Sequence, residues 1–502
     1  MKTFFKILEF QKFEFLLLLI FSGILSFFEG LLHPLMVKWL FDEAILKLNF
    51  QKFVLLSVLY LALGLIFVML FYINSLWKKR FENKVVLNLE SELLKKTFNH
   101  DLKEFNKKGF GYFVNSIHKD VLEGVVPMID MVINIVSMVI SEIALLLAMF
   151  YISWRATIIL FIIVPPMMYI SNVISQKVRK KTSIEREKEG EYTSFLTSAL
   201  KAFKVMRIFN HLFEKTIWRH KEALESYLDS KYESFRAVKS TQVFGDVIRN
   251  TADTLSLIVA GYFVLIGKLS FGGFVAIINT FWRAVSSLFG IIQTIPQLQR
   301  YSEILDRIKK LLIMEKKKYF KFHDKISLKN VKLSYNGKMV IDLENLKIEP
   351  KSKVLVLGPN GSGKTTLLDV ISGYLSPDSG EVLRPKKVIA ITAPVELPEL
   401  TIDELIKDEN LIKELGLEKL KQKYPSNLSA GEKQKVALGI ALESEGDVYI
   451  FDEPLANIDE KSKKKLLDLI FKSTNSKTLI MVLHGEKEFH ELFDTKLYIE
   501  GR

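Results

Sequence analysis

The chain has 502 residues, 49% of them hydrophobic, and a formal net charge of +13. This length is too great for one hydrophobic core, so we expect two or more domains. The absence of cysteine excludes a disulfide framework, a thiolate metal site and a cysteine nucleophile.

Apolar segments dominate the chain up to Arg300. The stretch from Met1 to Glu14 has few basic residues and no small-residue cleavage site, so we interpret it as an interfacial segment that is retained. Later segments have the length, about 20 apolar residues, that crosses a bilayer. They are residues 15–41, 53–77, 125–153, 156–174, 243–266 and 271–293. We therefore predict an all-α transmembrane domain of six spanning helices over residues 1–315.

Positive charge is unevenly distributed among the connections. Residues 78–119 carry ten Lys or Arg and residues 177–239 carry fifteen, whereas the alternate connections are poor in both. Because Lys and Arg concentrate in cytoplasmic loops, the two long connections and the soluble C-terminal part are predicted to be cytoplasmic. This distribution accounts for the net charge without nucleic acid, and we predict no nucleic-acid partner.

Both long connections keep a helical pattern, so the spanning helices are predicted to continue into the cytoplasm. The pattern breaks at residues 99–101 and 107–111, which leaves room for a short transverse helix that could contact a soluble domain. A pair of solvated charged helices is the alternative interpretation.

Ionisable side chains interrupt the apolar segments. They are Glu29, His33, Asp130, Glu142, Asp246, Arg249, Asp253 and Arg283. Such groups are costly in hydrocarbon unless they face water or one another. They indicate either an aqueous cavity or pairing between helices, and the sequence leaves both open.

A glycine-rich loop marks the soluble part of the chain. It follows the apolar run 354–357 and precedes the helical pattern 366–371, which is the strand–loop–helix order of a phosphate-binding loop. Its glycines let backbone N–H groups close around a phosphate, while Lys364 supplies positive charge and Thr365 a hydroxyl ligand for Mg²⁺. The predicted ATP-binding residues are Gly358, Pro359, Asn360, Gly361, Ser362, Gly363, Lys364, Thr365 and Thr366.

Later strands end in residues suited to ATP hydrolysis. An apolar strand ends in Asp452, which suits the Mg²⁺ ligand shell, and Glu453, which could polarise a water for attack on the γ-phosphate. His484 follows another buried strand and could hydrogen-bond a terminal phosphate. Tyr335, upstream of the loop, could stack on adenine, and ordinary core packing is the alternative.

Residues 428–432, Leu-Ser-Ala-Gly-Glu, resemble the signature motif of ATP-binding-cassette (ABC) transporters, usually LSGGQ. The motif order over residues 324–502, with a D-loop at 457–459, is similar to that of the family's nucleotide-binding domain. The membrane half resembles the family's exporter fold. The resemblance implies a multidomain membrane protein in which a six-helix domain of the ABC exporter type precedes an α/β P-loop NTPase domain.

The resemblance also implies a dimer. Each ATP would lie between the phosphate loop of one chain and Ser429 and Gly431 of the other, with Asp459 in the D-loop. Glu453 and His484 would carry hydrolysis, and the ATP cycle would alternate access to a cavity. The implied partners are a second copy or a homologous half-transporter, membrane lipid and an unknown solute.

Some positions depart from the family pattern. No Gln lies between Lys386 and Leu400, where members carry one that contacts Mg²⁺ and the membrane domain, and its position falls on Ala393. We therefore expect slow or differently coupled hydrolysis. Ala430 and Glu432 replace the usual Gly and Gln of the signature, changes that we expect to be tolerated.

Three functions are compatible with the predicted domains and the resemblance to ABC transporters. The first is an exporter of a hydrophobic or amphipathic solute, such as a lipid, a peptide or a drug-like molecule. The second is an importer or lipid floppase on the same fold. The third is a non-transporting, ATP-dependent membrane sensor or regulator.

Overall fold

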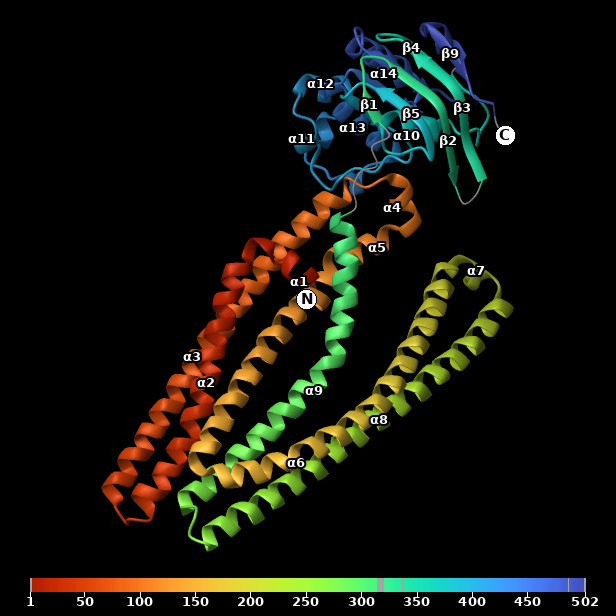
Figure 1. Ribbon diagram of the computed structural model, residues 1–502. Helices are drawn as coiled ribbons and strands as arrows, with labels where there is room; N and C mark the ends of the chain where they lie inside the picture. Colours follow the sequence, from red (N-terminus) through yellow and green to blue (C-terminus); the bar gives the residue numbers. More distant parts are fainter. Residues whose placement is uncertain (1, 314–319, 336–337, 486, 501–502) are drawn as a thin grey trace. The chain divides into compact units, whose positions relative to one another are not determined.

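The computed structural model describes residues 2–313, 320–335, 338–485 and 487–500, which form two compact units (Figure 1). The helical unit comprises the chain up to Lys96 and Val114–Ile313. The α/β unit comprises Thr97–Phe113 and the chain after Ile313. A short segment from the first third of the sequence therefore packs as part of the C-terminal unit.

Long helices form the helical unit. In chain order they are α1 (Lys2–Ile7), α2 (Lys12–Trp39), α3 (Phe50–Thr97), α6 (Val126–Lys201), α7 (Phe203–Ile208), α8 (Asn210–Leu265) and α9 (Phe271–Ile313). Short helical turns η1 (Glu9–Gln11), η2 (Leu40–Ile45), η3 (Asn115–Lys119) and η4 (Val121–Val125) connect them. Within α6 the backbone leaves helical geometry at Ser153, where φ is −160° and ψ 97°. Ser153 ends the predicted span 125–153, and the sequence predicts a turn between this span and the span 156–174.

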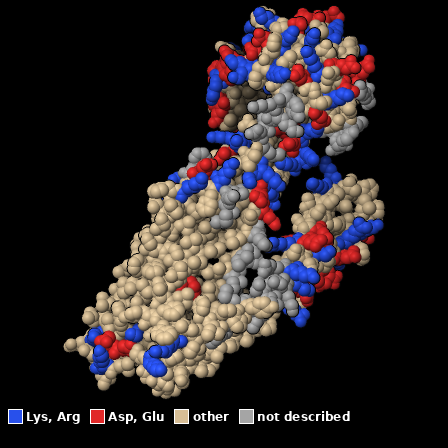
Figure 2. Space-filling view, in the orientation of Figure 1, with Lys and Arg blue, Asp and Glu red and all other residues tan. Residues whose placement is uncertain are grey.

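Three helical stretches of the described chain are long and apolar enough to cross a membrane: Lys12–Ile45, Phe50–Thr97 and Phe110–Pro166. The third contains the predicted span 125–153 and part of 156–174. The predicted spans 243–266 and 271–293 fall on α8 and α9, which are helical. On the visible face, Figure 2 shows a largely uncharged band between charged ends of the helical unit.

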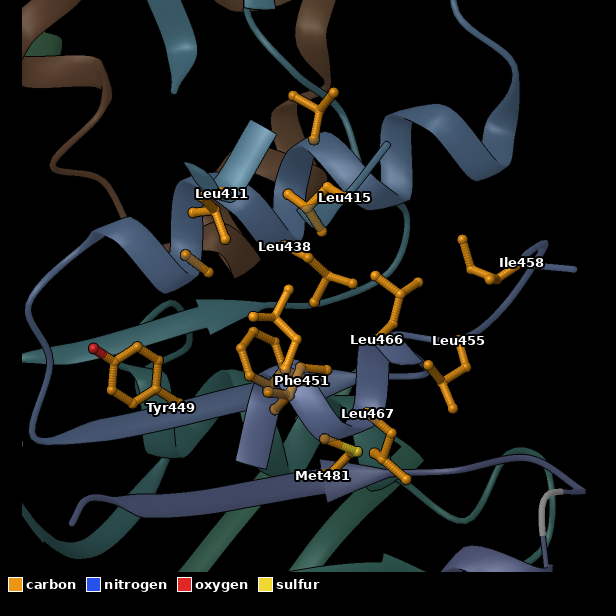
Figure 3. Packing of buried hydrophobic residues seen from close by; sticks show 14 of the residues in the cluster. Leu411, Leu415, Leu438, Tyr449, Phe451, Leu455, Ile458, Leu466, Leu467 and Met481 are labelled. Carbon is orange, nitrogen blue, oxygen red and sulfur yellow. The ribbon is translucent and has the colours of Figure 1, made fainter. Parts of the chain in front are cut away.

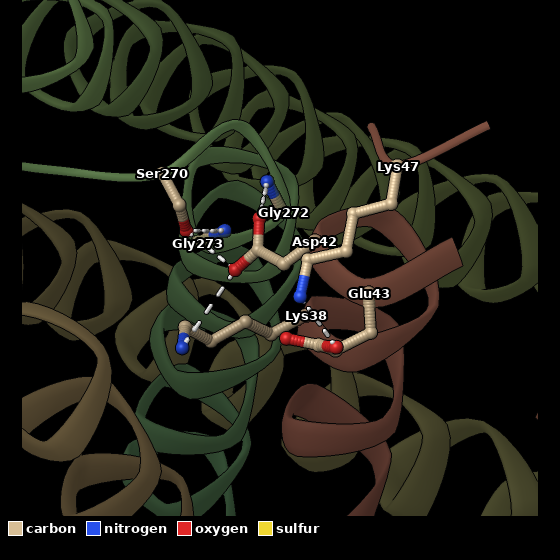
Figure 4. Close-up of polar contacts among 7 residues, drawn as sticks. All are labelled: Lys38, Asp42, Glu43, Lys47, Ser270, Gly272 and Gly273. Carbon is tan, nitrogen blue, oxygen red and sulfur yellow. Dashed lines mark hydrogen bonds and ion pairs between the residues drawn. The ribbon is translucent and has the colours of Figure 1, made fainter. Parts of the chain in front are cut away.

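Asp42, in η2 just after α2, ties that helix to the start of α9 (Figure 4). Its carboxylate accepts hydrogen bonds from Ser270 Oγ at 2.6 Å and from the Gly272 N–H at 2.8 Å. A Cβ atom on Gly272 would lie 2.4 Å from the carbonyl oxygen of Lys38, so this close approach requires glycine. The carboxylate also lies where the helix dipole of α9 favours negative charge.

The α/β unit contains two sheets. Strands β1 (Phe320–Phe322), β5 (Ser379–Arg384), β2 (Ile326–Tyr335) and β3 (Lys338–Ile348) form the first, in that order. The second has the order β6 (Val388–Ile391), β7 (Val448–Asp452), β8 (Thr478–Val482), β4 (Lys353–Leu357) and β9 (Thr495–Tyr498), with all pairs parallel. The α-helices that the C-terminal part of the chain adds to this unit are α10 (Lys364–Ser372), α11 (Ile402–Leu405), α12 (Glu409–Glu414), α13 (Ala430–Glu443) and α14 (Glu460–Ser473).

A hydrophobic core joins the parallel sheet to helices α12, α13 and α14 (Figure 3). Phe451 of β7 and Met481 of β8 point into it and are fully buried, and they meet Leu438 of α13 and Leu467 of α14. Every residue of β7 and β8 is buried, and most of them are apolar, which is typical of strands covered on both faces. This core fixes the positions of β7 and β8, whose carboxyl ends carry the candidate functional site.

The segment 97–113 contains a short helix where the sequence predicts one, α4 (Leu102–Lys108), followed by α5 (Phe110–Val114). Asp101 caps α4 by accepting from the Lys103 N–H at 2.8 Å, and its other oxygen accepts from the Ser376 N–H at 2.6 Å. The Leu102 N–H donates to the Tyr374 carbonyl oxygen at 2.9 Å. The cap of α4 thus also fixes this helix to the loop that follows α10.

Candidate functional site

The loop between β4 and α10 has a backbone that only glycine adopts easily. Gly358, Gly361 and Gly363 have φ values of 153°, 80° and 94°. A Cβ atom on Gly358 would also lie 2.3 Å from the carbonyl oxygen of Ile499. The conformation of this loop therefore depends on its glycines. A loop of this kind before a helix N-terminus presents backbone N–H groups to an anion.

Side chains of the same loop supply further groups for a phosphate. The Lys364 ammonium donates to the carbonyl oxygens of Gly358 at 3.0 Å and Pro359 at 2.9 Å, which holds it over the loop. The Ser362 hydroxyl is buried and has no hydrogen-bond partner among the described residues. An unpaired buried hydroxyl is costly, so it fits a loop that receives oxygen atoms of a ligand. Asn360 and Thr366 lie in this loop and in the first turn of α10, respectively.

Thr365 and Asp452 lie together although 87 positions separate them in the sequence. The Thr365 hydroxyl donates to Asp452 Oδ2 at 2.5 Å, and the Asp452 side chain is buried at the end of β7. One hydroxyl and one carboxylate are oxygen ligands of the kind that Mg²⁺ uses when phosphate and water complete its shell. The residues present therefore fit a magnesium ion bound together with a nucleotide.

Glu453 follows β7 with a left-handed backbone, φ 49°, which is unusual for a residue other than glycine. Hydrogen bonds on both sides hold this conformation: the Glu453 N–H donates to Val482 O at 3.1 Å, and Gln434 Nε2 donates to Glu453 O at 3.4 Å. Strained backbone that neighbours over-determine is common at functional sites. The fixed backbone of Glu453 sets the direction in which its side chain leaves the chain.

His484 reaches the same edge of the sheet through the strand register. Asp452 pairs with Val482 across β7 and β8, and Val356 of β4 pairs with Val482 on the other side. The phosphate loop, Glu453 and His484 each follow one of these three adjacent parallel strands. Ligands of open α/β sheets bind at such carboxyl ends. His484 is exposed there.

Ser429 and Glu432 form a capping box at the start of α13. The Ser429 hydroxyl donates to Glu432 Oε2 at 2.7 Å, and the Ser429 N–H donates to the same oxygen at 2.8 Å. The hydrogen bond from the Ser429 backbone, and then that from its side chain, lower the pKa of Glu432. The S-x-x-E spacing could have revealed this local role of Glu432 from the sequence.

Gly431 touches the segment after β7. A Cβ atom there would lie 2.4 Å from the carbonyl oxygen of Asn457. Asp459, two residues further on, caps α14 by accepting from the Ser462 N–H at 3.0 Å, and hydrogen bonds from Ser462 lower its pKa. Asp459 thus caps its own helix, α14, whereas Ser429 and Gly431 lie at the N-terminus of α13.

Tyr335 is the last residue of β2, and its backbone pairs with Lys338. Its side chain lies outside the described part of the structure. Ala393, at the position of the missing glutamine, lies just after β6, the strand that pairs with β7.

Asp369 of α10 is a buried carboxyl near the site that sequence reasoning missed. Burial raises its pKa to about 6, a hydrogen bond with Thr392 opposes that shift, and the neighbouring charge of Asp452 adds to it. Its position in an amphipathic helix gave no sign of burial.

Comparisons with known proteins agree with this architecture. A family model described as "ABC transporter transmembrane region" matches residues 13–287, and one described as "ABC transporter" matches residues 342–456. The "Multidrug resistance-like ATP-binding protein MdlB" of Buchnera aphidicola subsp. Schizaphis graminum (strain Sg) is 24% identical, over 90% of this chain and 85% of that protein.

One further relative matches only part of the chain, and one solved structure matches the fold of nearly the whole chain. The "Probable sulfate/thiosulfate import ATP-binding protein CysA" of Chlorella vulgaris is 32% identical over 35% of this chain and 87% of that protein. A solved structure described as "a bacterial Atm1-family ABC exporter with ATP bound" superposes with a TM-score of 0.80 over 96% of this chain and 93% of that chain. Its sequence identity of 16% makes this a likeness of fold. The fold is that of an exporter-type helical domain followed by an α/β nucleotide-binding domain.

Proposed function

Because this chain belongs to the ABC transporter family, we propose that it exports a hydrophobic or amphipathic solute by alternating access, working as a dimer. Family membership makes it an integral membrane protein and an ATP-hydrolysing transporter of the exporter type, with the nucleotide-binding domain in the cytoplasm. The class of solute, the dimer and the role of each residue are the proposal.

The arrangement at the carboxyl edge of β7, β8 and β4 carries the proposal. We infer that the loop Gly358–Thr366 binds the phosphates of ATP, and that Thr365 and Asp452 hold Mg²⁺, which neutralises charge on the phosphate oxygens. Glu453 would orient the attacking water and accept its proton as the bond from the γ-phosphorus to the bridging oxygen breaks. His484 would hydrogen-bond the terminal phosphate, Tyr335 would stack on adenine, and Asp459 would fix the D-loop beside the nucleotide.

Exposed apolar side chains support a second protein copy. Around α7, which links α6 to α8, the side chains of Phe203, Ile208 and Phe209 are 60%, 73% and 47% exposed. A cytoplasmic helix tip with such side chains is typical of a surface that another protein covers. In the dimer that we propose, Ser429 and Gly431 at the N-terminus of α13 complete the ATP site of the other copy.

ATP hydrolysis by the purified chain in phospholipid vesicles, with Glu453→Gln as the matched variant, tests the proposal. We expect the variant to bind ATP while its hydrolysis rate falls by at least about 100-fold, because a positioned base contributes about 10² to 10⁴. Hydrolysis that survives this substitution would contradict the role of Glu453.

Solute movement distinguishes the functions that share this ATP site. ATP-dependent accumulation inside inside-out vesicles is expected for an exporter. Movement in the opposite direction would indicate an importer, and transfer of labelled lipid between leaflets a floppase. Hydrolysis without movement of any probe would favour the sensor or regulator.

A further inference from the structure

Glu142 of α6 is a buried carboxyl in the membrane-spanning part of the helical unit. The residue is 7% exposed, and neither oxygen of its carboxyl has a hydrogen-bond partner among the described residues. It lies on the helix before the turn at Ser153, at a distance of roughly 16 Å for a rise of 1.5 Å per residue. Because the hydrocarbon core is about 30 Å thick, Glu142 lies near the middle of the bilayer.

The surroundings of this carboxyl are largely apolar. A space of about 10 Å³ beside Glu142 is lined by both halves of α6 and by α9, with side chains such as Leu146 and Val285. Thr157 also lines it, but its hydroxyl already donates to the Ser153 carbonyl oxygen at 2.8 Å. Ser287 of α9 lies close to the carboxyl, yet its hydroxyl too has no hydrogen-bond partner in the described part of the chain.

Positive charges on the neighbouring helices are held by other acids. Arg283 of α9 donates to both carboxylate oxygens of Glu29 of α2, at 2.6 and 2.7 Å. Arg249 of α8 pairs with Asp246 on the same helix. The other charged or imidazole side chains in the spans of α2 and α8 are Lys38, which pairs with Asp42, His33, which is hydrogen-bonded to Tyr60, and Asp253. Among the described residues, no cation forms an ion pair with Glu142.

These surroundings favour a neutral carboxyl. An ionised carboxylate in an apolar space without a cation is far more costly than a protonated one. A water molecule needs roughly 10 to 15 Å³, so the space admits one water at most and no solute. A metal cation takes several oxygen ligands, more than this lining offers. A second copy cannot supply the missing charge either, because α6 and α9 of the same chain already cover Glu142.

We propose that Glu142 is a proton-binding site of the helical unit, which holds a proton while α6 and α9 are packed and releases it when these helices admit water. This inference rests on the proposed alternating access, because release requires a second state of the helices. In that state the carboxyl transfers its proton to a water molecule, which leaves a carboxylate and a hydronium ion. A proton is taken up again when the helices close, so one proton per copy is bound and released in each cycle.

A hydrophobic carbodiimide tests the protonation state, because it enters the bilayer and reacts with protonated carboxyls. The probe is dicyclohexylcarbodiimide. The carboxyl O–H adds across one C=N bond, and the acyl group then moves to nitrogen, so the whole reagent stays on the side chain as an N-acylurea. The full chain in phospholipid vesicles is treated at pH 7.5, and mass spectrometry locates the label. Glu29, which Arg283 binds, is the control within the same molecule.

Without nucleotide, we expect Glu142 to be labelled at least about ten-fold more than Glu29, because an ion pair favours the ionised form. Glu142→Gln should remove this label. In Glu453→Gln, which should bind ATP without turnover, addition of ATP and Mg²⁺ should lower the labelling of Glu142 by at least about five-fold. Equal labelling of Glu29, labelling that ATP does not change, or protection by NaCl but not by choline chloride would overturn the proposal.

Thermal unfolding provides a measurement that does not depend on access of the reagent. A glutamine resembles the protonated carboxyl, so Glu142→Gln should shift the unfolding temperature by less than about 2 °C at both pH 6 and pH 8. Glu29→Gln, which leaves Arg283 without its acid, should lower it by at least about 3 °C. If Glu142→Gln instead raised the unfolding temperature at pH 8 by more than about 3 °C, Glu142 would be ionised and the proposal would fall.

The outcomes separate the proton site from the transport function. State-dependent labelling of Glu142 in vesicles that accumulate no solute would leave the proton site and overturn export. Accumulation of solute by a protein whose Glu142 labelling is the same with and without ATP would leave export and overturn the proton site.

Discussion

Asp369 shows how burial within the site changes the chemistry of one residue. Its side chain is only 7% exposed, and burial raises its pKa to about 6 from an ordinary value of 3.8. A carboxyl with a raised folded-state pKa favours the protonated form, so its contribution to stability is greatest at low pH. That contribution is lost as the pH rises from about 4 to about 6 and stays lost above.

Asp369→Asn should therefore stabilise the α/β unit at pH 7.5 by about 1 to 3 kcal/mol and have a clearly smaller effect at pH 4.5. The measurement is thermal unfolding of the nucleotide-free chain at both pH values. Asp468→Asn, on the exposed side of α14, is the control. An equal effect at the two pH values would show that the Asp369 charge is not the cause.

Gly431 is the second residue whose role depends on a single contact. An alanine Cβ would lie 2.4 Å from Asn457 O, so the D-loop or α13 must move. We expect Gly431→Ala to slow ATP hydrolysis by at least about ten-fold and to cost about 1 to 3 kcal/mol in stability, the usual range for overpacking. Gly190→Ala, where an added Cβ meets open space on α6, should leave hydrolysis unchanged and should not destabilise the protein. Normal hydrolysis by Gly431→Ala would contradict this interpretation.

At the scale of elements, α4 is held to the α/β unit by the same residue that starts it. Asp101 caps the helix with one oxygen and accepts from Ser376 with the other, while Lys103 pairs with Asp378 at 2.6 Å. Asp378 Oδ2 also accepts from the Ser334 N–H at 2.8 Å, next to Tyr335. This helix is thus linked both to the loop after α10 and to the end of β2.

Asp101→Ala should loosen α4 by about 0.5 to 2 kcal/mol, the typical cost of a lost N-cap. Faster hydrogen exchange in residues 101–108 of the intact chain, together with weaker stimulation of hydrolysis by solute, is the expected result. Asp101→Asn keeps an oxygen acceptor, so its exchange rate should lie between those of Asp101→Ala and the unaltered chain. Exchange as slow as in the unaltered chain would show that the cap is dispensable.

At the scale of the whole molecule, the proposed dimer depends on the apolar tip around α7. Ile208 is 73% exposed, and an acidic side chain there would have to be buried by a partner without compensation. We expect Ile208→Asp to reduce ATP hydrolysis by at least about ten-fold and to lower the dimer fraction after cross-linking. Leu228→Asp, another exposed apolar position on α8, should have a smaller effect. Full hydrolysis by Ile208→Asp would argue that this tip is not an interface.

The sequence alone determined the features that follow from local chemistry. Apolar length fixed α2 and α3, the pattern break fixed α4, and the glycine-rich loop fixed the strand–loop–helix around Lys364, because each depends on residues close in the chain. Family membership and the membrane location, predicted from the motif order and the charge distribution, are confirmed by the comparisons. The roles of the individual site residues stay predictions.

Tertiary structure decided whatever depends on residues distant in sequence. The sequence left pairing and an aqueous cavity open for the ionisable residues in the spans, and the structure pairs Glu29 of α2 with Arg283 of α9. Likewise only packing revealed that Asp101 reaches Ser376 and that Asp369 is buried. Periodicity states which face of a helix is apolar, but the partner of that face is set by the competition among all the helices that could cover it.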